Sequence, residues 1–384
     1  MKQKLCFITG SRAEYGLLKP LMERVKADKN YTFQLIVSGS HLLSLFGNTY
    51  KEILNDNFKI DAKVKISTNT NTPLNVASAT GETVIGISKE LERLKPDLVI
   101  LLGDRYEMLA AAIASHLMSV PVAHIHGGEI TEGSLDDAMR HAITKLSLIH
   151  FTATEAYRKR VLQMGEEHHR VFNVGSLGIE NYSKVKFLGK RALEQKMGIL
   201  LEKPLAVVTF HPATRESINT SKQVQALIKA LDSIPQMQLV ITYPNADAGA
   251  REIIDKMERY VSGRENAFIY KNLGTLNYLS LLKYTDIVIG NSSSGIIEVP
   301  SYGIPTINIG ERQQGRIAAK SVIHTQAKEN EIKKAIQKAL KPSFRATCKL
   351  VANPYDNGLA SKNIITILHK FKNFRTIEKK FIDW

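Results

Sequence analysis

The feature that most constrains this chain is a repeated alternation between short apolar runs and longer amphipathic segments. Runs rich in Val, Ile and Leu are typical of fully buried strands, while segments such as 106–118 and 136–148 carry helical periodicity. Strands that alternate with helices indicate parallel sheets joined by right-handed crossovers. The predicted strands are 4–9, 33–37, 97–102, 120–125, 149–153 and 171–174, and then 205–210, 239–243, 267–271, 286–290 and 305–310.

A polar helical stretch at 183–203 separates the two groups of strands. With 384 residues, the chain also exceeds what one ordinary hydrophobic core accommodates. We therefore predict an α/β protein with two Rossmann-like domains in series, and a last helix pattern at 361–373.

Composition excludes several classes of protein. An apolar fraction of 43% with 23% charged residues is typical of soluble globular proteins, and no apolar run approaches the length of a membrane span. The two cysteines, Cys6 and Cys348, have no metal-ligand spacing and fit a reduced, cytoplasmic setting. The formal charge of +15 suits a polyanionic nucleotide. Because the lysines are spread along the chain, we expect no nucleic-acid partner.

Polar clusters follow the predicted strands at their carboxyl ends, where ligands of open α/β sheets bind. Any single one of these loops is explained by ordinary turn chemistry. Their shared position indicates a ligand cleft between the two domains. The clusters are 10–16, 103–107, 126–137, 211–214, 244–249 and 291–295.

The stretch GNSSSGIIEVP, from Gly290, places three serines between a strand and a helix start. Small residues with hydroxyl donors let a phosphate approach the free backbone N–H groups of a helix start. Ser292–Ser294 therefore predict a diphosphate cradle, with a plain serine N-cap as the alternative. Glu298, one turn later, is a candidate acceptor for ribose hydroxyls.

Arginines and acid–base groups complete the candidate site. Arg12 and Arg312 are placed to bind phosphate, while the fingerprints of dinucleotide-binding and P-loop proteins are absent from the sequence. Asp104, with Arg105 beside it, follows one strand and His126 with Glu129 follows the next. Asp136 begins a helix, where it acts as an acid–base group or only as an N-cap. His124 is expected to be a core histidine, and no metal site or cofactor is expected. 

These motifs resemble, in order and over nearly the whole chain, the hydrolysing UDP-N-acetylglucosamine 2-epimerases of bacterial sialic-acid biosynthesis. The resemblance implies the glycosyltransferase-B fold, with domains at 1–178 and 179–363 and a C-terminal helix at about 364–384 packed back on the first domain. It also implies a homodimer or homotetramer. The motifs are GSRAEYGLLKPL, SGSHLL, FGNTY, GDRYE, HIHGGE, DDAMRHAITKL, HPAT, PNADAG, GNSSSGIIEVP and NIGERQQGR.

The resemblance implies a reaction as well. UDP is eliminated from UDP-N-acetylglucosamine to leave 2-acetamidoglucal, and water then adds to give N-acetylmannosamine. Asp104 and Asp136 match acid–base positions of the family. The nucleotide is expected at Arg12, Arg105, His211, Asn245, Asp247, Ser292, Ser293, Glu298 and Arg312, with uracil at the backbone near Leu273.

One residue of this chain departs from the family pattern. The resemblance also leaves more than one sugar as the candidate substrate. Many relatives read HIEGGE where this chain reads HIHGGE, so the proton transfer falls to His126, to Glu129 or to a water. An alternative hypothesis is that the enzyme performs the same chemistry on a UDP-2,4-diacetamido-2,4,6-trideoxy sugar of the legionaminic-acid pathway. A glycosyltransferase of the same fold is a third reading, although such an enzyme needs no group that moves a C2 proton.

Overall fold

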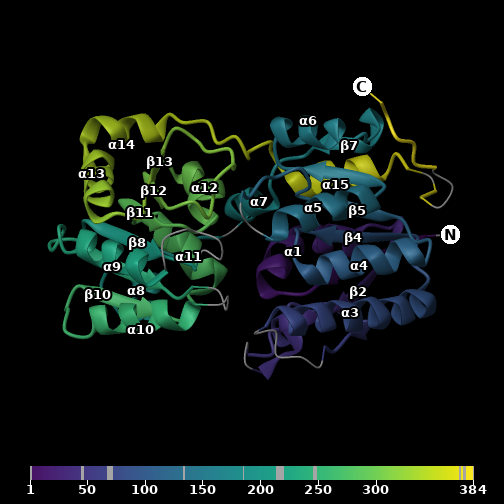
Figure 1. Ribbon diagram of the computed structural model, residues 1–384, viewed down its shortest axis with the longest axis horizontal. Helices are drawn as coiled ribbons and strands as arrows, with labels where there is room; N and C mark the ends of the chain where they lie inside the picture. Colours follow the sequence, from purple (N-terminus) through teal and green to yellow (C-terminus); the bar gives the residue numbers. More distant parts are fainter. Residues whose placement is uncertain are drawn as a thin grey trace. The chain divides into compact units, whose positions relative to one another are not determined.

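The computed structural model describes residues 2–44, 47–66, 72–132, 135–184, 186–212, 220–244, 249–371, 373–374 and 378–383, apart from the side chains of 181–184. The chain forms two compact units, shown in Figure 1. Unit 1 comprises Met1–Glu129, Leu135–Asn181 and Asn357–Trp384, and unit 2 comprises Ile130–Ser134 and Tyr182–Asp356.

Unit 1 is built on a seven-stranded parallel sheet with the order β3-β2-β1-β4-β5-β6-β7. The prediction of a parallel α/β sheet is confirmed. The strand β3 was missed, because its two residues are too short to form an apolar run. The strands are β1 (Gln3–Thr9), β2 (Tyr31–Val37), β3 (Ala62–Lys63), β4 (Leu98–Leu102), β5 (Val122–Ile125), β6 (Ile149–Thr152) and β7 (Val171–Asn173).

Helices cover both faces of this sheet. Successive side chains of a strand point to opposite faces, so Leu5 and Phe7 of β1 join one apolar cluster while Cys6 and Ile8 join another. Helices α1 and α15 pack on the first cluster, and α3, α4 and α5 pack on the second. The α-helices of unit 1 are α1 (Arg12–Ala27), α2 (Tyr50–Asn55), α3 (Pro73–Leu94), α4 (Tyr106–Leu117), α5 (Leu135–Leu146), α6 (Glu155–Gln163), α7 (Leu177–Lys184) and α15 (Ala360–Leu368); short 3-10 helices lie at Gly39–Leu42 and His168–Arg170.

Helix α15 comes from the far end of the chain but belongs to the core of unit 1, where it lies against α1 (Figure 1). Ile364 and Leu368 are fully buried there. The helix ends at Leu368, whereas the expected helix ran on to about 384. Residues 378–383 are not helical because their backbone bonds to other parts of unit 1, for example from Ile382 N to Gly165 O at 3.0 Å.

Unit 2 repeats the architecture on a six-stranded parallel sheet with the order β10-β9-β8-β11-β12-β13. The edge strand β13 was missed because its sequence, VIHT, is half-buried and lacks a continuous apolar run. The strands are β8 (Leu205–Thr209), β9 (Gln238–Thr242), β10 (Ala267–Tyr270), β11 (Ile287–Gly290), β12 (Thr306–Ile309) and β13 (Val322–Thr325). The helices are α8 (Lys190–Met197), α9 (Thr220–Leu231), α10 (Ala250–Val261), α11 (Gly274–Leu282), α12 (Ser294–Ile297), the 3-10 helix Val299–Tyr302, α13 (Glu329–Leu340) and α14 (Pro342–Lys349).

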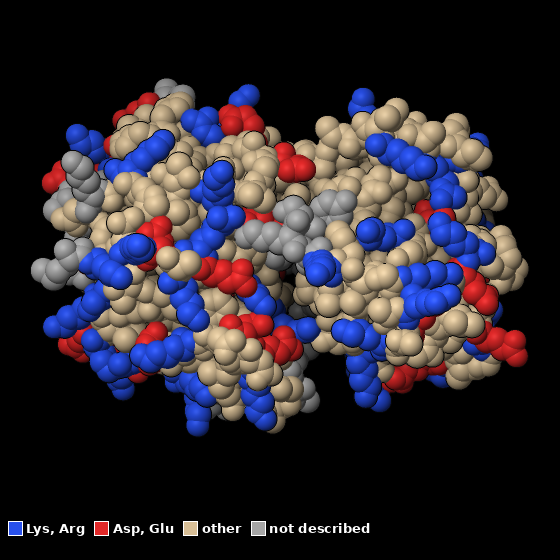
Figure 2. All heavy atoms as spheres, turned by 180° about the vertical axis from the view of Figure 1, so that it is seen from behind, with Lys and Arg blue, Asp and Glu red and all other residues tan. Residues whose placement is uncertain are grey.

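The basic side chains of the protein are not gathered into one patch on the face shown in Figure 2. On the face shown in Figure 2, Lys and Arg side chains are distributed over both units, with Asp and Glu between them. Within the described residues, every helix is too short or too polar to cross a lipid bilayer.

Candidate functional site

The acid–base candidates of unit 1 gather around one buried arginine, Arg140 of α5, whose side chain is 1% exposed. Its Nε donates to Asp104 Oδ2 at 3.0 Å, and Nη2 binds the same oxygen. Its Nη1 donates at 2.8 Å to both the Glu129 carbonyl oxygen and Asp137 Oδ1. The structure thus brings together the exits of β4 and β5 and the first turn of α5.

Arg140 was not among the predicted site residues. Burial alone would lower its pKa, but the negative charges of Asp104, Glu129 and Asp137 outweigh it and raise the pKa. Its partner on α5 is Asp137, three residues earlier, while the predicted Asp136 is half-buried beside it. The spacing of Asp137 and Arg140 was visible in the sequence as a helical ion pair, but its link to Asp104 was not.

His126 occupies the exit of β5 with a backbone φ of 68°, in the left-handed region that non-glycine residues rarely adopt. Its Nδ1 lies 3.5 Å from Glu129 Oε1, and both side chains are nearly buried. His126 N donates to Phe151 O at 2.9 Å, which fixes the strained residue against β6. Strain of this kind, of order 1–3 kcal/mol, clusters at functional sites. The structure therefore places His126 and Glu129 together, as their sequence positions predicted.

A second carboxylate group lies at the exits of β1 and β4. Glu14 Oε2 accepts bonds from the backbone N–H of Gly10 and Ser11, at 2.8 and 3.2 Å. Glu107 is buried next to it and binds Arg105 Nε at 3.2 Å. Burial, followed by the charge of Glu107, raises the pKa of Glu14 to about 8. This pair was not predicted from sequence.

The two arginines of unit 1 that were predicted to hold the nucleotide form ion pairs in this structure. Arg105 binds Glu107, and Arg12, the first residue of α1, binds Glu52 at 2.9 Å. Both side chains remain at least one third exposed, so the guanidinium groups are accessible to an anion.

In unit 2, Asn291 joins the loops that follow β8 and β11. Its Oδ1 accepts from His211 N at 2.6 Å, and its Nδ2 donates to His211 O at 2.9 Å. Its own carbonyl oxygen accepts from Arg312 at 3.1 Å and from Gln313 at 3.0 Å. Burial and the nearby Arg312 lower the pKa of His211 to about 3, so this imidazole is neutral at pH 7. His211 and Arg312 were predicted from the sequence, whereas Asn291, which connects them, was not.

The turn before Asn291 tolerates only glycine. Gly290 has a φ of 140°, and a Cβ atom there would lie 1.8 Å from the carbonyl oxygen of Thr209 on β8. The close approach of β8 and β11 at this point holds the His211 loop against Asn291.

The serine stretch does lead into a helix, but a short one. Helix α12 spans only Ser294–Ile297 and passes into a 3-10 helix, because Pro300 has no N–H to continue an α-helix. Ser292 and Ser293 are half-buried, and Ser294 Oγ lies 2.8 Å from the hydroxyl of the half-buried Tyr278. A strong helix-terminus effect on phosphate is therefore not expected here, and hydroxyl donors are the main resource of this loop.

The remaining residues predicted to hold the nucleotide lie at the end of α12, just before α11, or outside the described residues. Glu298, half-buried, is the residue at which α12 ends. Desolvation raises the pKa of Tyr278, and the charge of Glu298 adds to this effect. Leu273 is buried in the apolar cluster under α8 and immediately precedes α11. Asn245 and Asp247 lie outside the described residues.

Residues 23–369 match the family model described as UDP-N-acetylglucosamine 2-epimerase. The chain is 40% identical over 384 residues, covering 100% of this chain and 99% of the relative, to the GDP/UDP-N,N'-diacetylbacillosamine 2-epimerase (hydrolyzing) of Campylobacter jejuni. It is 35% identical to the UDP-N-acetylglucosamine 2-epimerase of Neisseria meningitidis, covering 88% of each chain.

Among solved structures, a putative UDP-N-acetylglucosamine 2-epimerase from Listeria monocytogenes superposes with a TM-score of 0.82 at 21% identity, covering 100% of both chains. At that level of identity the likeness concerns the fold. It confirms the predicted architecture of two Rossmann-like domains.

Proposed function

Since the chain belongs to the UDP-N-acetylglucosamine 2-epimerase family, we propose that it is a hydrolysing 2-epimerase of a UDP-linked 2-acetamido sugar. Its products are UDP and the free sugar with inverted configuration at C2. The observation that carries the proposal is the Arg140 centre of unit 1, which gathers Asp104, Asp137 and the Glu129 backbone beside His126.

The reaction has two halves. In the first, a base removes the C2 proton, the electron pair forms a C1–C2 double bond, and the C1–O bond to UDP breaks with its electrons on the phosphate. In the second, the oxygen of water bonds to C1 and a proton is delivered to C2 on the opposite face. The C1–C2 electron pair forms the new C2–H bond, and the proton that water loses passes to the group that protonated C2. The proton taken from C2 in the first half leaves with UDP or to solvent, so one water is consumed and the enzyme returns to its initial protonation state.

This chemistry needs proton-transfer groups in different environments, so that one accepts while another donates. We assign Asp104 and Asp136 as acid–base groups, and His126 or Glu129 as the group that exchanges the C2 proton. Arg140, itself buried, forms an ion pair with the carboxylate of Asp104, which keeps that oxygen oriented.

Nucleotide binding is assigned mainly to unit 2. Arg312 offers a guanidinium to the diphosphate, and the neutral His211 is held beside it by Asn291. Hydroxyl donors of the serine loop complement them. The full proposed set is Arg12, Arg105, His211, Asn245, Asp247, Ser292, Ser293, Glu298 and Arg312, with uracil against the backbone near Leu273.

We propose the UDP-linked 2,4-diacetamido-2,4,6-trideoxy sugar as the first substrate to test, because the relative named for diacetylbacillosamine is 40% identical over the whole chain. UDP-N-acetylglucosamine is the second candidate, supported by the relative at 35% identity. Its product, N-acetylmannosamine, would serve sialic-acid synthesis. The two sugars differ at C4 and C6, so a few side chains around those carbons decide between them.

The test is proton NMR of the purified protein with each UDP sugar in deuterated water. The proposal expects stoichiometric UDP and a free C2-inverted sugar with deuterium at C2 from at least one of them. UDP release with the C2 hydrogen retained contradicts the elimination step. If neither sugar reacts, the proposed function is wrong.

A further inference from the structure

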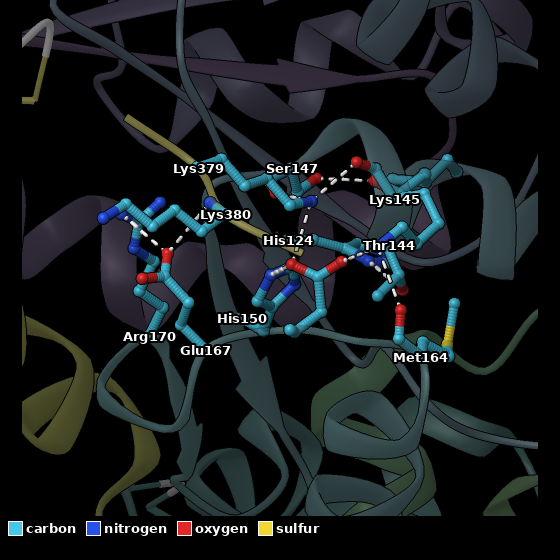
Figure 3. A network of polar contacts seen from close by, with 12 residues as sticks. His124, Thr144, Lys145, Ser147, His150, Met164, Glu167, Arg170, Lys379 and Lys380 are labelled. Carbon is cyan, nitrogen blue, oxygen red and sulfur yellow. Dashed lines mark hydrogen bonds and ion pairs between the residues drawn. The ribbon is translucent and has the colours of Figure 1, made fainter. Parts of the chain in front are cut away.

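Residues 378–383, termed here the C-terminal segment, lie along unit 1 and make specific polar contacts (Figure 3). Arg170 binds the carbonyl oxygen of Glu378. Ile382 N donates to Gly165 O at 3.0 Å, where a side chain at Gly165 would collide with the ring of Phe381. The segment is therefore docked in one register against the loop that follows α6.

Lys379 is the residue of this segment that reaches inward, and its side chain is 26% exposed. Its ammonium group donates to Lys145 O at 2.6 Å and to Ser147 O at 2.8 Å, and it lies 2.8 Å from Glu166 Oε2. These partners use all three donors of the ammonium group. Lys145 belongs to the last turn of α5, so Lys379 places a positive charge on the carboxyl end of that helix. The amino end of α5 carries Asp136 and Asp137, and Arg140 follows one turn later.

Glu166, whose side chain is 1% exposed, is the shared anion of the cluster. Lys145 Nζ lies 2.6 Å from Oε1, and His150 Nε2 lies 3.0 Å from Oε2. Burial alone would raise the pKa of Glu166, but hydrogen bonds from His150, Lys145 and Lys379 outweigh it and lower the pKa to about 2. At neutral pH the group is a buried carboxylate that depends on these three donors.

His150 connects the cluster to the centre of the sheet. It is the register partner of His124 on the neighbouring strand β5. Ile125, Ile149 and Phe151, the strand neighbours of these histidines, face the opposite apolar cluster, so both histidines point to the side that α5 covers. Figure 3 shows the two imidazoles side by side, with Thr144 of α5 next to His124.

His124 carries the connection to the site. Its Nε2 lies 2.8 Å from the carbonyl oxygen of Gly103, the residue before Asp104. Burial lowers the pKa of His124 to about 3, so the ring is neutral and its proton must sit on Nε2, because a carbonyl oxygen only accepts. Nδ1 therefore faces the hydroxyl of Thr144 as an acceptor, at 3.1 Å. The same hydroxyl also lies 3.1 Å from the carbonyl oxygen of Arg140, one turn earlier, so the two acceptors share its proton.

We infer that Lys379 is a positioning residue for the acid–base centre of unit 1. It holds the carboxyl end of α5 and the Glu166–His150 pair, and thereby keeps Arg140 and the Gly103–Asp104 turn in register. The inference rests on the proposed function for its kinetic part only. The groups that face His150 are Glu166, Lys145, Lys379 and the neutral His124.

The experiment compares Lys379→Met and Lys379→Arg with Lys380→Met in the full-length protein. Lys380 is the matched control, since its contact with Glu167 uses the backbone N–H. In Lys379→Met we expect a fall in kcat of tenfold or more, with KM and the Kd of UDP within about twofold of wild type. Lys379→Arg should restore most of the rate, and Lys380→Met should match wild type. Should Lys379→Met not fold, Lys379→Gln replaces it.

Amide and imidazole NMR gives a second readout that needs no turnover. Loss of the ammonium charge near His150 should raise the pKa of that imidazole and shift the amide resonances of Gly103 and Asp104, in Lys379→Met but not in Lys380→Met. If these signals stay unchanged, the inference is overturned even where the wild-type enzyme releases no UDP. An unchanged kcat, or a lower melting temperature with kcat intact, also overturns it. If neither sugar reacts with the wild type while the NMR shifts appear, the positioning contact stands and the proposed function alone is wrong.

Discussion

Arg140 binds Asp104: its Nε donates to Asp104 Oδ2 at 3.0 Å, and the Arg140 side chain is only 1% exposed. The same guanidinium group binds Asp137 and the backbone of Glu129. Removal of one member of such a buried network leaves the others without compensation, at a cost of about 3–5 kcal/mol. The centre is therefore sensitive to small changes in charge and length.

Asp104→Asn should abolish UDP release while UDP binding stays within about threefold of wild type, because the carboxylate serves proton transfer and not the nucleotide. Single-turnover assays and calorimetry with UDP measure the two quantities. Asp97→Asn is the matched control, because Asp97 directly precedes β4 whereas Asp104 follows it. Near-wild-type turnover in Asp104→Asn would remove this residue from the mechanism.

The variants His126→Asn and His126→Ala distinguish a proton-transfer role of the imidazole from a role of His126 in the backbone conformation. Asparagine tolerates a φ of 68° better than alanine does, yet neither side chain titrates near neutral pH. If the imidazole transfers the proton, both variants should lose at least about a hundredfold in kcat, the lower end of what general acid–base catalysis contributes. Retained activity in His126→Asn alone would instead assign His126 a conformational role and leave the transfer to Glu129.

Arg312→Ala should weaken UDP binding by roughly 10- to 150-fold, the equivalent of the 1.5–3 kcal/mol of one hydrogen bond to a charged group. Arg345→Ala is the control, since Arg345 binds Asp286 next to the opposite end of β11, at 2.6 Å. Calorimetric titration with UDP measures both variants. Equal affinities for UDP in the two variants would exclude Arg312 from the nucleotide site.

Glu14 should give the protein a falling stability with rising pH. Its pKa is about 8 in the folded state against 4.5 for the unfolded chain, so between these values the folded state binds the extra proton. Stability from this group is complete below about pH 4.5 and is lost as pH rises toward 8, by up to about 1.4 kcal/mol per pH unit. Glu14→Gln keeps the oxygen acceptor for Gly10 and Ser11 and should flatten this slope in urea unfolding at pH 5–8. An unchanged slope would contradict the pKa assignment.

Ile364→Ala, in α15, should destabilise the protein by about 2–5 kcal/mol, as a large-to-small change in a core. Lys362→Ala, on the exposed side of the same helix, should change stability by less than about 0.5 kcal/mol. Urea denaturation followed by far-UV circular dichroism distinguishes them. Similar small effects would mean that α15 is not part of the core of unit 1.

The sequence predicted the features that rest on local pattern. Most strands were predicted because they are apolar runs. Strands β3 and β13 were not predicted, because β3 has only two residues and β13 is half-buried. Asp104, His126 and Glu129 were found because strand exits are readable from the order of elements. Arg140 and Asn291 were missed as organisers, because their partners, Asp104 and His211, become neighbours only in the folded chain. The contact of Lys379 with Glu166 could not be predicted either, because these two residues are far apart in the sequence and meet only in the folded chain.

The composition of the units has a consequence for how this chain can be divided. Residues Ile130–Ser134 fold with unit 2 although both flanking stretches fold with unit 1, and Asn357–Trp384 returns to unit 1. Glu132 N, for instance, donates to Gln314 O at 3.2 Å inside unit 2. No single cut therefore yields two complete folding units. A fragment ending near residue 181 would lack α15 and would contain the stretch 130–134 without the rest of unit 2. The complementary fragment would lack the stretch that Gln314 binds. The two units are made of interleaved stretches of sequence, so neither unit corresponds to one contiguous stretch of the chain.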